Sequence, residues 1–139
     1  MILWAHSAHL SQSKQTFLEE PMGITLAASL QDDYFSLTTM TAAGSYLQWQ
    51  DPTRTKTYVP VTRTFAALPP ASYETSIRQR GEPYLLIPFR KVLPQWLAGS
   101  KGYNSAGAAG PAGAEGVLAT QFDGAIFIDT TTAMHPLVH

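Results

Sequence analysis

Cysteine is absent from this 139-residue chain, and charged side chains are few. Without cysteine the chain has no disulfide, no thiolate nucleophile and no cysteine-ligated zinc site, and this composition fits a cytoplasmic protein. Only 14% of the residues are charged and the net charge is -1, so no electrostatic attraction favours nucleic acid or an anionic membrane surface. We therefore expect neither a nucleic-acid partner nor a membrane partner.

Long apolar runs are also absent. No stretch approaches the roughly 20 residues that a membrane-spanning helix needs. The first residues are not a secretory signal, because they lack a basic segment and their apolar run stops at His6. What the chain does contain is 45% hydrophobic residues, in a length that suits one domain. The sequence therefore predicts a single folded unit over residues 1–139.

Short apolar runs alternate with helical patterns along the chain. Strands are expected over residues 2–5, 34–38, 84–89 and 125–129, and runs such as "YLLIPF" and "GAIFID" are typical of strands buried inside parallel sheets. Apolar residues at four-residue spacing predict a helix from Pro21 to Gln31. A second helix is expected between Ser72, as its cap, and Gly81. The predicted fold class is α/β, with a mostly parallel sheet flanked by helices.

Two regions depart from this alternation. Residues 41–64 are rich in Thr, Tyr, Trp and Pro, and they predict extended pieces or an antiparallel excursion over the sheet. Residues 99–116 contain "SAGAAGPAGAEG", which predicts a flexible loop. A run of one or two helical turns is expected just before this loop, in "LPQWLAGS".

Three candidate site residues follow predicted strands. His6 comes after the first strand, Arg90 follows "YLLIPF", and Asp129 ends "GAIFID". Ligands bind at the carboxyl ends of parallel strands, so these residues are expected at one rim of the sheet. Other interpretations stay open, because a histidine after a strand often anchors a loop and Arg90 and Asp129 can form an ordinary ion pair.

A metal site is a further alternative. His6 and His9 are three residues apart, and the potential additional ligands are Asp129, His135 and His139. The spacing matches no known zinc pattern, since zincins place a glutamate beside the first histidine on a helix. No metal or other cofactor is therefore predicted, but a histidine-based metal-binding module stays open.

Several motifs together resemble one family. The segments "ILWAHSAHLS" and "MGITLAASLQDDYFSLTT" with a following "GSY" look like the second half of the erythromycin esterase family, which includes succinoglycan biosynthesis proteins. Later segments agree in order, namely "PPASYETSIRQRGEPYLLIPFR" and "FDGAIFIDTTTAMHPL". The resemblance covers nearly the whole chain.

The resemblance implies a hydrolase that cleaves an ester or lactone, macrolides included, with histidine as general base on water. His6 is the catalytic residue that it carries over. His9 is expected to orient His6 or to contact the substrate, and Arg90 to stabilise an oxyanion or anchor a carboxylate. Asp129 is a supporting candidate from its place at the rim.

The departures from the family bear on activity. Ser7 stands where the family has asparagine, and only "KGYNSAGAAG" remains of a motif around Tyr103. The N-terminal half of family members, which supplies another catalytic histidine and a glutamate, has no counterpart here. The chain is therefore interpreted as a truncated domain, inactive alone, with self-association through an exposed sheet edge. A non-catalytic half-domain is the alternative.

Overall fold

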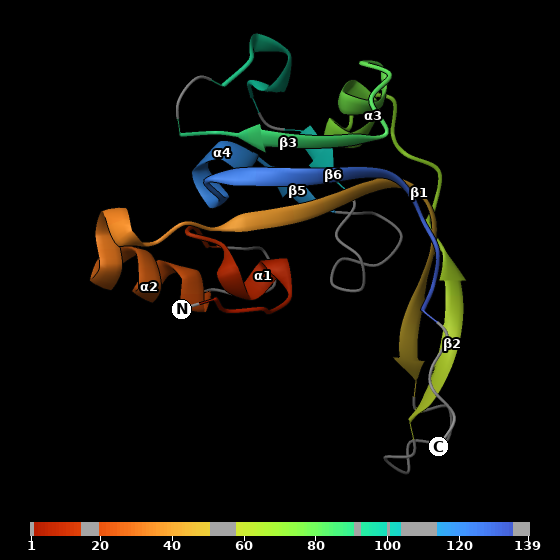
Figure 1. The fold of residues 1–139 in the computed structure, drawn as a ribbon, viewed down its shortest axis with the longest axis horizontal. Helices are drawn as coiled ribbons and strands as arrows, with labels where there is room; N and C mark the ends of the chain where they lie inside the picture. Colours follow the sequence, from red (N-terminus) through yellow and green to blue (C-terminus); the bar gives the residue numbers. More distant parts are fainter. Residues whose placement is uncertain are drawn as a thin grey trace.

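The computed structural model describes residues 2–14, 20–50, 58–90, 93–99, 101–103 and 114–134. Within these ranges the main element is a four-stranded sheet in the order β2-β1-β6-β3. Its strands are β1 (Leu37–Gln50), β2 (Val59–Thr64), β3 (Tyr84–Pro88) and β6 (Gly124–Thr131). Figure 1 views this sheet from one face, with β3, β6 and β1 side by side.

The sheet is mixed, and the prediction of a mostly parallel sheet is wrong. Only β1 and β6 run parallel. β2 returns antiparallel to β1, and β3 runs antiparallel to β6. The apolar runs located β3 and β6 correctly, but side-chain pattern carries no information about strand direction.

Of the other predicted elements, some are confirmed and others are shifted or wrong. The helix expected over 21–31 is confirmed as α2 (Met22–Leu30), and a 3-10 turn, η1 (Gln31–Asp33), follows it. The strand expected over 34–38 begins only at Leu37 and continues as β1. The strand expected over 2–5 is wrong, because no described strand pairs with this segment; Ile2 and Trp4 are 94% and 88% exposed.

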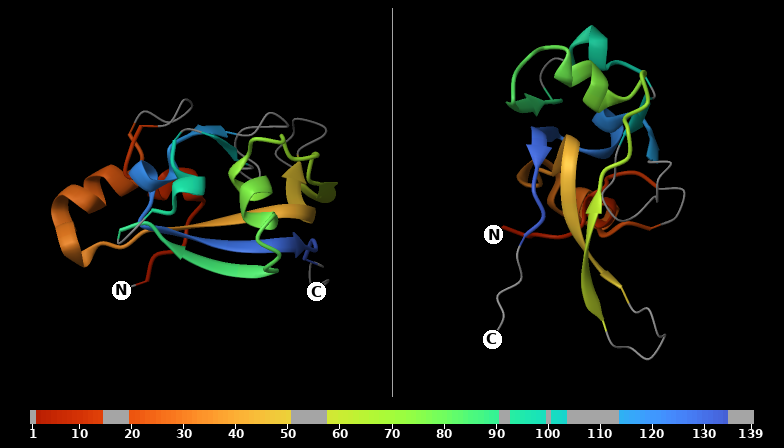
Figure 2. Two further views of the ribbon diagram at one scale, coloured as in Figure 1. Left: turned by 90° about the horizontal axis from the view of Figure 1, so that it is seen from above. Right: turned by 90° about the vertical axis from the view of Figure 1, so that its right-hand side faces the viewer.

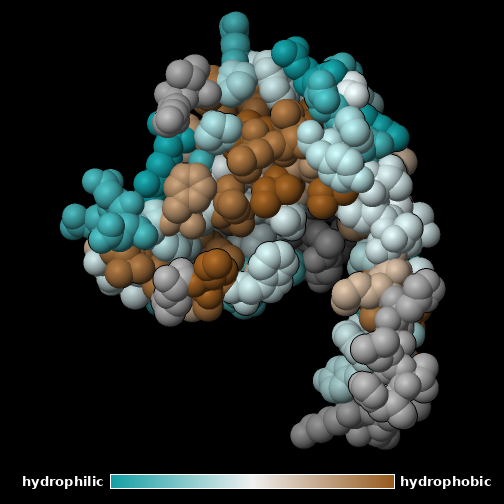
Figure 3. Space-filling model, viewed as in Figure 1, coloured by the Kyte–Doolittle hydropathy of each residue, from teal (hydrophilic) through white to brown (hydrophobic). Residues whose placement is uncertain are grey.

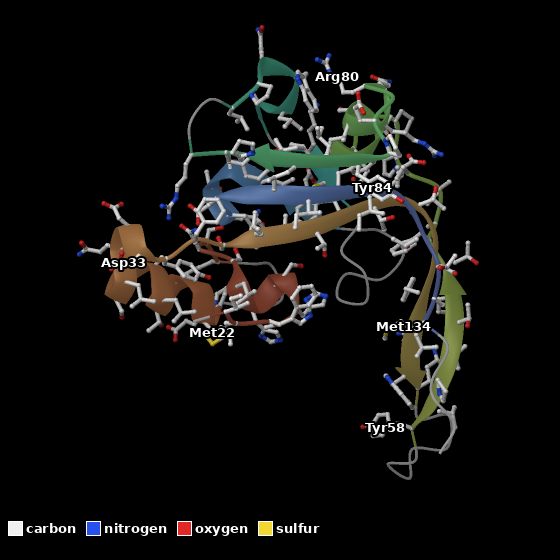
Figure 4. All side chains as sticks on the ribbon, in the orientation of Figure 1. Met22, Asp33, Tyr58, Arg80, Tyr84 and Met134 are labelled. Carbon is white, nitrogen blue, oxygen red and sulfur yellow. The ribbon has the colours of Figure 1, made fainter. Side chains whose placement is uncertain are left out.

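β1 changes partner halfway along its length. Leu37 to Gly44 pair with β6, whereas Ser45 to Gln50 pair with β2. The second half of β1 and β2 form an antiparallel arm that leaves the body of the sheet, with Tyr58 near its far end (Figures 1 and 4). The antiparallel pairing predicted for residues 41–64 is therefore present, but the arm leads away from the sheet rather than over it; residues 51–57 lie outside the described residues.

One face of the sheet is covered by a layer of short elements (Figure 2). They are α3 (Tyr73–Arg78), η2 (Gln95–Leu97), α4 (Leu118–Gln121) and a small antiparallel sheet of β4 (Lys101–Tyr103) and β5 (Ala114–Gly116). The core between the layers includes Met40, Ala42, Tyr73, Ile77, Ile87, Leu97, Leu118, Phe122, Ala125 and Phe127. A further single-turn helix, α1 (Ser7–Leu10), packs against α2 and β1.

Short sequence patterns account for the local structure of two elements in the covering layer. The Ser72 hydroxyl accepts the Thr75 N–H, so the predicted cap of α3 is confirmed. "LPQWLAGS" forms the single turn η2, as expected. The two ends of the segment 99–116 form β4 and β5, and residues 104–113 lie outside the described residues.

Gly44 is the residue at which β1 changes partner, and it generates the first prediction. Its φ is +108°, and a β-carbon there would meet the Thr131 carbonyl oxygen at 1.9 Å. Gly44→Ala therefore adds both backbone strain and a clash with backbone, and we expect a loss of about 3 kcal/mol in the free energy of unfolding. Urea denaturation measures it.

Gly81→Ala is the matched control. Gly81 also has a positive φ, +78°, but no atom lies within 4 Å of its would-be β-carbon. Only the strain remains, so the expected loss is about 1 kcal/mol. Equal losses for the two variants would show that the close approach of β6 to Gly44 does not constrain the fold.

Candidate functional site

The two N-terminal histidines lie on one helical turn. His6 caps α1: its Nδ1 accepts the Ala8 N–H at 3.2 Å, and its carbonyl accepts the His9 N–H at 2.9 Å. The two rings stand edge to face with their centroids 6.4 Å apart, and both residues are exposed. A neutral imidazole that accepts at Nδ1 carries its proton on Nε2. His6 thus presents an N–H donor at Nε2, and its basic nitrogen is engaged by the cap.

The buried carboxylate of Asp123 lies close to Gln12, which follows the helical turn that carries the histidines. Asp123 is only 6% exposed and stands directly before β6. Its Oδ2 accepts the Ser36 N–H at 2.7 Å, the Ser36 hydroxyl at 3.2 Å and the Gln12 side-chain amide at 2.7 Å. Its Oδ1 accepts the Arg90 Nε–H at 2.5 Å. We call Asp123, Arg90, Ser36 and Gln12 the Asp123 cluster.

Arg90 completes this cluster from the end of β3. Its second donor reaches the Tyr34 carbonyl, and its guanidinium lies 5.2 Å from the centre of the Phe35 ring. Burial alone would raise the pKa of Asp123, but the hydrogen bonds and charge from Arg90, with the Ser36 donors, lower it below its ordinary value. Asp123 is therefore held as a carboxylate, and Arg90 is engaged in holding it.

The Asp123 cluster anchors the turn that carries the histidines. Gln12 follows α1 by two residues and is fixed twice, through its side chain to Asp123 and through its N–H to the Gln121 carbonyl at 2.8 Å. The Tyr34 hydroxyl donates to the Leu10 carbonyl, the last residue of α1, at 3.1 Å. The position of His6 and His9 on the sheet is thus set by contacts that end at Asp123 and Tyr34.

Arg90 and Asp129 do not share a rim, which corrects the expectation from the sequence. Because β3 is antiparallel to β6, Arg90 meets the start of β6, whereas Asp129 lies about 20 Å further along that strand. Asp129 pairs instead with Arg78 of α3 at 2.9 Å, so the ordinary ion pair is found with a different arginine. The structure brings Arg90 to Asp123, Tyr34 and Phe35 rather than to Asp129.

Sequence reasoning missed Asp123, Ser36, Gln12 and Tyr34. A signal was available for Asp123, since "FDG" places a carboxylate just before an apolar strand. Only the antiparallel direction of β3, however, shows that Arg90 meets this carboxylate. Gln12 and Ser36 carry no signal of their own, because their contacts join segments 24 to 111 residues apart.

A second buried polar cluster serves the covering layer. The Tyr73 hydroxyl contacts the Gly99 carbonyl, lies 3.1 Å from the Gly116 carbonyl and accepts the Leu118 N–H at 3.4 Å. Burial raises the pKa of Tyr73, which therefore remains a neutral hydrogen-bonding group. This tyrosine ties both ends of the segment 99–116 to α3 and α4, and we interpret the cluster as structural.

The described residues contain no group of three or more His, Asp or Glu side chains placed to hold a metal ion. Of the ligands considered for a metal site, His135 and His139 lie outside those residues. The structure also has, over the same ranges, no helix that is long and apolar enough to cross a membrane.

Comparison with known proteins identifies the family. The sequence profile named for erythromycin esterase matches residues 1–131. The chain belongs to the erythromycin esterase family. No curated protein sequence matches the chain.

Three solved structures are similar to this chain, and each aligns with 93% of it. A protein from Bacillus cereus is 20% identical, with a TM-score of 0.71 and 33% of its own length covered. A succinoglycan biosynthesis protein is 17% identical (TM-score 0.72, 32% covered), and an erythromycin esterase mutant in its open conformation is 23% identical (TM-score 0.67, 31% covered). These likenesses support the fold, and this chain spans about one third of each relative, less than the expected half.

The Asp123 cluster generates the second prediction. Because the pKa of Asp123 is lowered by folding, the unfolded chain takes up this proton at a higher pH than the folded chain does. The stabilisation is complete above about pH 4 to 5 and is lost as the pH falls through the lowered pKa. We expect Asp123→Asn to cost about 2 kcal/mol at pH 7 and to flatten the decrease in stability below pH 4, measured by denaturation from pH 7 to pH 3.

Asp129→Asn is the matched control for this experiment. The Arg78 side chain of its ion pair is 53% exposed, so we expect the variant to cost less than about 1 kcal/mol at pH 7. An Asp123→Asn variant with the stability and acid sensitivity of the parent would contradict the role given to the cluster.

Proposed function

We propose that this chain provides the histidine-bearing part of an ester or lactone hydrolase. The observation that carries the proposal is the exposed pair His6 and His9 on one anchored turn, inside the region that matches the erythromycin esterase family. A small-molecule ester is the substrate class, and a macrolide lactone is one member of it. The rest of the catalytic site comes from the part of the family domain that this chain does not span.

In the proposed reaction an imidazole removes a proton from water while the water oxygen attacks the ester carbonyl carbon. The carbonyl electrons move to oxygen and form a tetrahedral oxyanion. The oxyanion then collapses and expels the alkoxide, which takes the proton back from the imidazolium. The products are a carboxylic acid and an alcohol, so the overall change is the addition of water across the ester bond.

The geometry of α1 supports a different proposed role for each histidine. Nε2–H of His6 is a donor suited to the carbonyl oxygen of a substrate. For His6 to act as the base, its Nδ1 must first release the Ala8 N–H, a weak bond at 3.2 Å. His9, on the same turn, is proposed to orient the substrate or His6.

Arg90 is proposed as a positioning residue rather than an oxyanion donor. Its Nε is bound to Asp123, and another of its nitrogens donates to the Tyr34 carbonyl. Through Asp123 it holds Gln12, and through Gln12 the end of α1. Asp129 lies at the other end of β6, bound to Arg78, and has no role in the proposed reaction.

The third prediction tests the role of His6 in a protein that joins this chain to the remainder of a family domain. His6→Ala and His6→Asn should both lower ester hydrolysis by roughly 10²–10⁴-fold, since both remove the imidazole. His9→Ala should have a smaller effect. Initial rates with a nitrophenyl ester and, separately, mass spectrometry of an opened macrolide lactone provide the measurements.

His6→Asn separates catalysis from capping. Asparagine is a good N-cap and preserves the Ala8 contact, whereas alanine removes it. If His6→Asn kept the parent's rate while His6→Ala lost activity, His6 would be a structural cap only and the proposal would fail.

The fourth prediction concerns the 139-residue chain by itself. Because the chain spans only about one third of each structural relative, water activated at His6 lacks the groups that the rest of the domain is proposed to supply. We expect ester turnover no faster than the buffer reaction. Turnover above that level by the isolated chain, abolished by His6→Ala, would show instead that this third of the domain is sufficient.

A further inference from the structure

The two faces of the main sheet differ in what covers them. Met40, Ala125, Phe127 and Ile87 point to the face covered by α3, η2 and α4, and all four are buried. Residues of the opposite face alternate with them along the same strands. That second face, which we call the open face, consists of the apolar residues Tyr84, Leu86, Pro88, Ile126, Ile128 and Leu37, together with Thr39 and Thr41 of β1.

The strand register makes the open face one continuous patch. Leu86 lies opposite Ile126, and Tyr84 lies opposite Ile128. The Leu37 side chain extends over Gly124, whose would-be β-carbon would meet the Leu37 Cδ2 at 2.9 Å. Figure 3 shows hydrophobic side chains gathered over this part of the sheet, and Figure 4 labels Tyr84 at the start of β3.

The open face exposes more apolar surface than single hydrophobic residues scattered over a protein surface would expose. Tyr84 and Leu86 are 73% and 64% exposed, and Ile126 and Leu37 are also exposed. Single apolar residues on a surface are normal, but a contiguous apolar patch over β3 and β6, bordered by Leu37 of β1, marks a contact surface. Parallel strands in particular are normally covered on both faces, and β1 and β6 form a parallel pair.

The likeness to longer proteins indicates what covers the open face. The chain aligns over 93% of its length with solved proteins of which it spans only 31–33%, so about two thirds of such a domain lies outside the match. The N-terminal segment, with Ile2 and Trp4 exposed, emerges on the side of the sheet that carries the open face (Figure 2). Apolar surface therefore extends beyond the sheet on that side.

We propose that the open face is the docking surface for the remaining two thirds of an erythromycin esterase family domain, which contributes an apolar layer packed on β1, β6 and β3. Helices are the usual cover for the faces of such a sheet, so the occupant presents a helix with an apolar side. The proposal rests on the family and the surface, and it holds whether or not the assembled protein hydrolyses esters.

The experiment is site-specific cross-linking in the cells that make the protein. A photo-reactive phenylalanine analogue replaces Leu86 on the open face or, as the control, Thr62 on the exposed arm strand β2. Mass spectrometry identifies the peptides joined to each position. We expect Leu86 to cross-link to the remaining two thirds of an erythromycin esterase family domain, at least tenfold more than Thr62 does.

Every other result overturns the proposal. Cross-links from Leu86 to a second copy of the same residues would make the open face a homodimer surface. Cross-linking at position 86 that is absent, unspecific or no stronger than at position 62 would show that nothing of this family covers the face.

A second measurement uses substitutions. Leu86→Glu should weaken association with the cross-linked partner at least tenfold in a binding titration, because it places a charge in the centre of an apolar contact. Thr62→Glu should leave binding unchanged. The melting temperatures of both variants are compared first, and equal binding by parent and Leu86→Glu contradicts the docking role even if both remain folded.

Discussion

A single carboxylate joins the parts of this structure that are far apart in sequence. Asp123 accepts hydrogen bonds from the residue that precedes β1, from the arginine that follows β3 and from the segment that follows α1. Its own backbone continues these links, since its N–H donates to the Ser36 carbonyl and its carbonyl accepts the Phe89 N–H. A buried charge is stable only when its lone pairs are satisfied, and four donors satisfy those of Asp123. The order β1-β6-β3 at this end of the sheet depends on that arrangement.

The geometry of the candidate site depends on the Asp123 carboxylate. One helical turn of four residues is too short to be stable by itself, so α1 needs contacts outside its own backbone. Gln12 and the Tyr34 hydroxyl provide them at its C-terminal end, and both belong to or adjoin the Asp123 cluster. The proposed catalytic role of His6 and the stability provided by Asp123 are for this reason linked, because the turn that holds the imidazole is anchored through the carboxylate.

Sequence patterns located the elements of the sheet better than they located its contacts. The helix of "MGITLAASL", the cap at Ser72 and the strands of "YLLIP" and "GAIFID" follow from local periodicity and capping chemistry, which act over a few residues. Strand direction, by contrast, is decided by tertiary pairing, and the assumption of parallel strands placed Arg90 beside Asp129. The family motifs single out His6 as a candidate, but its capping bond to Ala8 is a local geometric fact that no motif contains.

The strands β3 and β6 carry apolar side chains on both of their faces, although only one face of the sheet is covered. "YLLIP" supplies Ile87 to the core and leaves Leu86 and Tyr84 in water, and "GAIFID" does the same with Phe127 and Ile126. Burial of such side chains contributes roughly 25 cal/mol per Å² of apolar surface, so a second layer on the open face adds folding free energy that the present contacts lack. If that layer belongs to the part of the domain that also completes the catalytic site, covering the sheet and assembling the site are one event. In that case the proposed activity and the stability of the sheet depend on the same partner surface.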